Sequence, residues 1–165
     1  MKKIMELLQN MKAKNEKKDN KGFSLVELII VIAIMAILVG IVGTQVLPYL
    51  NKSKEEKDRQ ILSAYTTAAV SAYGMVSDQL TTDVTVAGAK ITVNVYSPAA
   101  SDADAKLLSD KIQELMGKGY TDAKSKMTSA QGKKATAITI TYDFDKQTVE
   151  TEATGTSIKK VSGDL

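Results

Sequence analysis

The chain has 165 residues and a formal net charge of +3 at pH 7, and it contains no cysteine, histidine or tryptophan. A chain of this length fits one modest domain plus an anchor. Without cysteine and histidine it has no disulfide, none of the usual ligands of zinc and copper, and neither the commonest general base nor a thiol nucleophile. We therefore expect no metal, no cofactor and no enzymatic activity.

The N-terminal segment, residues 1–22, carries most of the charge asymmetry. It holds seven lysines and three acidic residues, which leaves a net charge of −1 for residues 23–165 and gives little reason to expect a nucleic-acid partner. By the positive-inside rule these lysines keep the segment in the cytoplasm and send the C-terminal part outward. Four of its apolar residues lie at helical spacing and predict either a short amphipathic turn on the inner membrane face or no specific role: Ile4, Leu7, Leu8 and Met11.

Residues 23–50 form an apolar segment that one acidic residue interrupts. A helix from Phe23 to Leu47 would reach about 37 Å, enough to cross a hydrocarbon core of about 30 Å. Glu27 directly precedes the apolar run that extends from Leu28 to Gly43. A charge at the centre of a bilayer costs on the order of 2.5 to 3.5 kcal/mol. We therefore expect this carboxylate to have a function that offsets the cost.

The junction before this run resembles the type III signal of type IV pilins, in which the leader ends in Gly, the mature chain begins with Phe and its fifth residue is Glu. Gly22, Phe23 and Glu27 stand at these positions in the sequence Lys21-Gly22-Phe23-Ser24-Leu25-Val26-Glu27-Leu28-Ile29. The resemblance implies that a prepilin peptidase cleaves before Phe23 and N-methylates its amine. The resemblance covers the first third of the chain closely. Many pilins of Gram-negative bacteria have a C-terminal disulfide, and this chain, which has no cysteine, more closely resembles the cysteine-free pilins of Gram-positive bacteria.

Cleavage would leave a free amine on Phe23, one helical turn from Glu27. The two groups can pair within one helix, or Glu27 can take the amine of a neighbouring subunit and so fix the register of a filament. The resemblance implies this assembly role for Glu27. The alternative is a carboxylate that reaches the cytoplasmic interface and does nothing else.

Further along the helix, Gly40, Gly43 and Pro48 predict a bend or a partly unwound stretch over residues 40–48. The resemblance implies that this region melts in assembled filaments. Alternatively, the glycines permit close helix packing in the membrane. The helical pattern then continues as an apolar stripe on one face: Ile61, Leu62, Tyr65, Ala69, Ala72, Tyr73 and Val76.

The remaining residues alternate between strand and helix patterns. We expect a hairpin around residues 87–89 with strands near 84–86 and 91–95, and a second hairpin over 135–154. Between them, Ser101 and Asp104 resemble a capping box with Asp in place of Glu, and a short amphipathic helix should follow, with apolar residues at helical spacing: Leu107, Leu108, Ile112, Leu115 and Met116. Residues 120–134 read as a surface loop with little order, and residues 155–165 as a tail. The acidic residues here do not match a calcium loop and are assigned to helix caps and turns.

These elements predict an α+β fold of the pilin type, with a long N-terminal spine helix whose outer half packs on an antiparallel sheet of about four strands. The expected parts are a removed cytoplasmic leader (1–22), a transmembrane or filament-core half of the helix (23–50) and a globular head (51–165). The protein would be a single-pass membrane protein, N-terminus inside and C-terminus outside, before it joins an extracellular pilus.

The resemblance implies a structural subunit, a major pilin that supports surface motility, adhesion and biofilm formation. Its partners would be further copies of itself, the prepilin peptidase, the inner-membrane assembly machinery and, before assembly, membrane lipid. The alternatives are a pseudopilin or minor pilin of a type II secretion or DNA-uptake system, and a membrane-tethered binding module.

Overall fold

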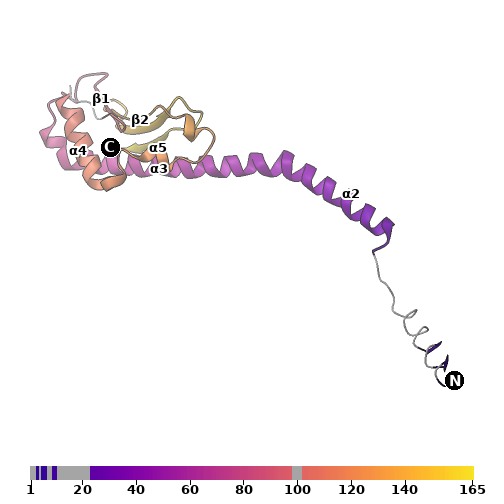
Figure 1. Ribbon diagram of the computed structural model, residues 1–165. Helices are drawn as coiled ribbons and strands as arrows, with labels where there is room; N and C mark the ends of the chain where they lie inside the picture. The colour runs from indigo at the N-terminus through magenta and orange to yellow at the C-terminus, as the bar shows by residue number, and fades with distance from the viewer. Residues whose placement is uncertain (1–2, 4, 7–8, 11–22, 98–101) are drawn as a thin grey trace. The chain divides into compact units, whose positions relative to one another are not determined.

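The computed structural model describes residues 3, 5, 6, 9, 10, 23–97 and 102–165 (Figure 1). The predicted amphipathic turn of the leader and the residues Gly22 and Ser101 lie outside the described residues. The chain divides into two compact units, Met1–Gln45 and Val46–Leu165, and each is described by itself.

The first unit contains the helix α2 (Leu25–Ile41), which is apolar on all sides. None of its residues is buried, and its large aliphatic side chains are about half exposed or more. Such a surface is unfavourable in water because apolar area contributes free energy only when it is removed from solvent.

Beyond α2 the helical hydrogen bonds change register in a π-helical turn, η1 (Val42–Val46). The Thr44 hydroxyl donates to the carbonyl of Gly40 at 3.0 Å. Pro48 follows this turn directly, within a helical run that continues from Leu25 to Gln79. A proline there cannot donate to the preceding turn, and the π-helical turn lies at the point where the regular hydrogen-bond ladder is interrupted. Residues 40–48 are helical in this structure, so the bend or unwinding expected there stays a prediction.

The second unit, called the head below, is built on α3 (Leu47–Val76), which continues into the short turn η2 (Ser77–Gln79). The predicted apolar stripe is confirmed: five of its members are buried and Ile61 and Tyr73 are half-buried against the core. The fully covered members are Leu62, Tyr65, Ala69, Ala72 and Val76.

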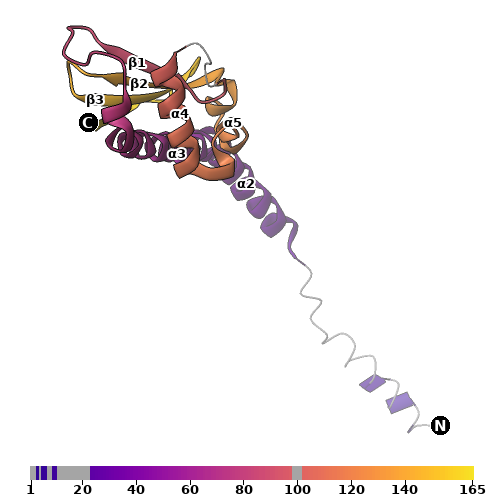
Figure 2. The ribbon, with the colours of Figure 1, turned by 90° about the vertical axis from the view of Figure 1, so that its left-hand side faces the viewer.

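A four-stranded antiparallel sheet packs on α3 and on α4 (Figure 2). Its strand order is β1-β2-β3-β4, with bounds Lys90–Asn94, Ala137–Asp143, Thr148–Thr154 and Val161–Asp164. The hairpin predicted over 135–154 is confirmed as β2 and β3, and the α+β fold with a long N-terminal helix is confirmed with it.

Two strand predictions were wrong. Residues 84–86 form no strand, because the Asp83 carboxylate accepts from both the N–H and the hydroxyl of Thr85 and closes a local turn. The strand that pairs with β1 is β2 instead, with Lys90 opposite Asp143. The predicted tail contains the fourth strand, β4, where Gly163 allows the backbone to approach the side chains of α3.

The helix α4 (Ala103–Met116) forms as expected but begins differently. Its N-cap is Asp102, whose carboxylate accepts from the N–H groups of Asp104 and Ala105. The capping role given to Asp104 was wrong, because its buried carboxylate accepts four hydrogen bonds from Thr81 and Thr82 instead. Burial raises the pKa of Asp104, but these hydrogen bonds outweigh it and hold the pKa below its usual range.

Residues 120–134 were predicted as a poorly ordered surface loop, and this was wrong. With the turn η3 (Gly117–Gly119) before them they form one segment, which contains two further helical turns, α5 (Ala123–Lys126) and η4 (Gly132–Lys134). Asp58 of α3 fastens it: one carboxylate oxygen accepts from the N–H of Thr128 at 2.9 Å, and the other from the N–H and hydroxyl of Ser129. We call this arrangement the Asp58 clasp.

The clasp predicts opposite effects for two glycine-to-alanine substitutions. A Cβ on Gly132 would collide with the Asp58 carboxylate and lie 2.8 Å from the Cβ of Met127, so Gly132→Ala should destabilise the head by about 1–3 kcal/mol. At Gly74, an exposed position in α3, a Cβ meets nothing within 4 Å, so Gly74→Ala should stabilise it by about 0.5–1 kcal/mol. Chemical denaturation of the full chain in detergent, followed by circular dichroism, measures both. Equal stability of the two variants would contradict the clasp.

Candidate processing and assembly site

The candidate site lies where the apolar helix begins. Phe23 precedes the helix in non-helical backbone and is 83% exposed, and Ser24 is the N-cap of α2. Gly22, on the other side of the predicted cleavage point, lies outside the described residues.

Ser24 and Glu27 form a capping box at this end of α2. The Ser24 hydroxyl accepts from the N–H of Val26 at 3.3 Å, and Oε2 of Glu27 accepts from the N–H of Ser24 at 2.9 Å. The arrangement satisfies N–H groups that have no partner within the helix. It also holds the Glu27 carboxylate beside residues 23 and 24.

The role of Ser24 was not predicted from the sequence. The signal was present, because a serine three residues before a glutamate at the start of an apolar run is the usual pattern of a capping box.

The predicted pair between Glu27 and the amine of Phe23 requires cleavage. In the full-length chain, Phe23 contributes an amide nitrogen, which carries no charge. The pairing therefore stays a prediction. The capping box engages only Oε2 of Glu27, and Oε1 accepts no hydrogen bond from any residue in the described part of the chain.

The apolar surface that follows this site is the second part of the arrangement. Among the described residues, one helical run, Leu25–Gln79, contains a stretch long and apolar enough to cross a membrane, and none of that stretch is buried. A continuous exposed apolar surface of this kind marks contact with lipid or with other protein chains.

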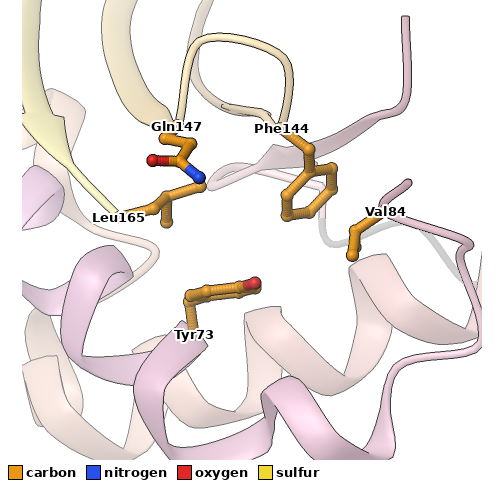
Figure 3. Close-up of a pocket in the computed structure, with 5 residues that line it drawn as sticks. All are labelled: Tyr73, Val84, Phe144, Gln147 and Leu165. Atoms are coloured by element: carbon orange, nitrogen blue, oxygen red, sulfur yellow. The ribbon is translucent and has the colours of Figure 1, made fainter. Parts of the chain in front are cut away.

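The described part of the head contains several hollows. The one drawn in Figure 3 has a volume of about 160 Å³ and is lined by Tyr73, Val84, Phe144, Gln147 and Leu165. The rings of Tyr73 and Phe144 lie on opposite sides of this hollow, with centroids 5.7 Å apart and planes tilted by 43°. Within the described ranges, no three side chains of the types that ligate metals gather closely enough to hold an ion.

One known sequence motif covers both the Gly22-Phe23 junction and the apolar run that follows it. The family described as the prokaryotic N-terminal methylation motif matches residues 17–43. No curated protein and no solved structure matches the chain. The match identifies a type IV prepilin signal, which confirms the resemblance stated from the sequence. Together with the long helix and the four-stranded sheet, it supports a type IV pilin-like protein, of the pilin or pseudopilin type.

Proposed function

We propose that this chain is a major pilin, the structural subunit of a type IV pilus that supports surface motility, adhesion and biofilm formation. The observation that carries the proposal is the wholly exposed apolar helix α2, headed by Glu27 at a prepilin processing junction. A helix of this kind has two favourable surroundings, a bilayer before assembly and a bundle of identical helices after it.

Processing is the first step of the proposal. The lysines of residues 1–22 hold this segment in the cytoplasm, and the helix that follows crosses the inner membrane with the C-terminal part outside. A prepilin peptidase cleaves between Gly22 and Phe23 and methylates the new amine. This removes the charged leader and keeps the apolar helix.

Assembly is the second step, and Glu27 directs it. The capping box holds the carboxylate in place through Oε2 and leaves Oε1 free to accept from a cation. In a dry bundle of helices that cation is the amine of Phe23 on a neighbouring subunit. Removing one partner of a buried ion pair costs about 3–5 kcal/mol, so a subunit that slips out of register is strongly disfavoured. The inner-membrane assembly machinery would draw subunits from lipid into this bundle.

Electron microscopy of filaments sheared from cells, together with mass spectrometry of their N-terminal peptide, tests the proposal. We expect abundant long filaments whose main subunit begins at Phe23 with a methylated amine. Correct processing with only short or scarce fibres would instead indicate a pseudopilin or minor pilin. A protein that still begins at Met1 and stays in the membrane would contradict both and favour the tethered module.

Two substitutions separate the charge of Glu27 from its role in the cap. Glu27→Gln keeps an oxygen that can accept from Ser24 but leaves the neighbouring amine without a counter-charge, so filament yield should fall on the order of 100-fold, as expected for about 3 kcal/mol. Ser24→Ala removes one cap hydrogen bond, worth about 1 kcal/mol, and should reduce yield only several-fold.

Quantitative immunoblotting of sheared filaments measures the yield, and membrane fractions show whether each variant inserts normally. Equal yields from Glu27→Gln and the unaltered chain would remove the charge pair from the assembly mechanism. Failure of Glu27→Gln to be cleaved would place the residue in processing instead.

A further inference from the structure

A basic cluster lies on the segment that the Asp58 clasp holds. Between Gly117 and Lys134 there are five lysines and one aspartate, a net charge of +4 in an otherwise balanced head. All five lysines are exposed, and none has a described carboxylate within 4 Å. We call them the lysine end: Lys118, Lys124, Lys126, Lys133 and Lys134.

The position of the lysine end on the head is fixed by contacts with α3. The clasp joins Asp58 to Thr128 and Ser129, and the hydroxyl of Tyr65 donates to the carbonyls of Gly119 and Tyr120. Since Asp58 and Tyr65 lie in the first two thirds of α3, the lysines gather toward the end of the head where this helix begins.

Acidic residues gather where α3 ends. Asp78 lies in the turn η2 that follows this helix. Thr81 and Thr82 tie the start of α4 to the same place through Asp104, and the contact of Tyr73 with Phe144 brings the turn between β2 and β3 there. Asp164 of β4 joins them, because it lies opposite Thr148, the first residue of β3 after that turn. Five exposed acids make up the acidic end, and none has a described lysine or arginine within 4 Å: Asp78, Asp83, Asp102, Asp145 and Asp164.

The two ends are too far apart to pair within one chain. Along α3, the anchors Asp58 and Tyr65 lie eighteen and eleven residues before Val76, which corresponds to about 27 Å and about 16 Å at 1.5 Å per residue. These separations are about two to three Debye lengths at physiological ionic strength, where that length is about 8 Å. Each end is therefore free to attract an oppositely charged partner.

We propose that the lysine end of one head docks on the acidic end of the head of another copy of this chain. Residues 46–165 carry fifteen basic and fifteen acidic side chains, so the heads have no net charge that would keep them apart. An unrelated polyanion would engage only the lysine end, whereas a second copy satisfies both ends. A contact between two different surfaces of the same protein leaves one of each kind open and propagates into a filament.

The inference rests on the proposed polymer and adds a second contact to it. Exposed charges contribute more to orientation and rate of association than to affinity. The apolar helices would thus provide most of the cohesion, and the charged ends would set which heads meet and in which orientation.

Zero-length crosslinking with a carbodiimide tests the contact in sheared filaments. The reagent joins a lysine to a carboxylate only when they touch, so any peptide that links Lys118–Lys134 to the acidic end comes from two different copies. We expect such peptides in filaments and not in the detergent-solubilised subunit. Filaments that form normally but give only links to nearby acids, such as Asp122, would overturn this inference and leave the proposed function intact. Absence of any filament from the unaltered chain would overturn both.

Charge reversal provides the matched genetic test. Lys124→Glu with Lys126→Glu, or Asp78→Lys with Asp164→Lys, should each lower filament yield by about tenfold, and the combination of all four should restore it to within about twofold. Lys111→Gln, midway along α4 and outside both ends, should leave yield within about twofold of the unaltered chain.

Circular dichroism melting of each full-length variant in detergent confirms that it folds. If the lysine reversals lower yield and the combination does not rescue it, the partner is not a second head. Loss of binding to vesicles rich in anionic lipid, with no rescue, would assign the lysine end to a membrane surface and overturn the proposal.

Discussion

The exposed apolar surface of α2 is unfavourable in water, so the helix must be surrounded by lipid or by other protein. This constraint underlies the proposed processing and assembly. The helix has no buried residue, and its apolar side chains point in every direction, so no single partner surface can cover it. A bilayer surrounds it completely, and so does a bundle of parallel copies. The transfer from one to the other exchanges one apolar environment for another. It therefore costs little hydrophobic free energy, and polar groups decide the register.

Two carboxylates show how the same chemistry serves two purposes. Asp58 uses both oxygens for N–H and hydroxyl groups of its own chain, and the result is a fixed segment between Gly117 and Lys134. Glu27 uses one oxygen in its capping box and keeps the other available. A fully satisfied carboxylate stabilises a fold, whereas a half-satisfied one in an apolar setting favours whatever brings it a cation.

The features predicted correctly from the sequence are those with local causes. The apolar run, the stripe from Ile61 to Val76 and the β2–β3 hairpin each follow from a periodicity of their own residues. The errors have two sources. Asp83 closes a short side-chain turn that overrides the alternation at 84–86, and the order of Gly117–Lys134 depends on Asp58, about seventy residues earlier in the chain. A polar stretch whose hydrogen-bond partners lie far away in the sequence has the composition of a loop, so its order cannot be predicted from that stretch alone.

The sheet has two outer strands, and their composition bears on what happens when many heads are crowded side by side. β4 is four residues long and contains Gly163 and Asp164, while β1 is five residues long and begins with Lys90. Short, charged or covered outer strands resist sideways strand addition, the route by which crowded sheets fuse into amyloid. In the proposed filament, neighbouring heads would therefore lie side by side without joining their sheets, and each head would keep its own fold.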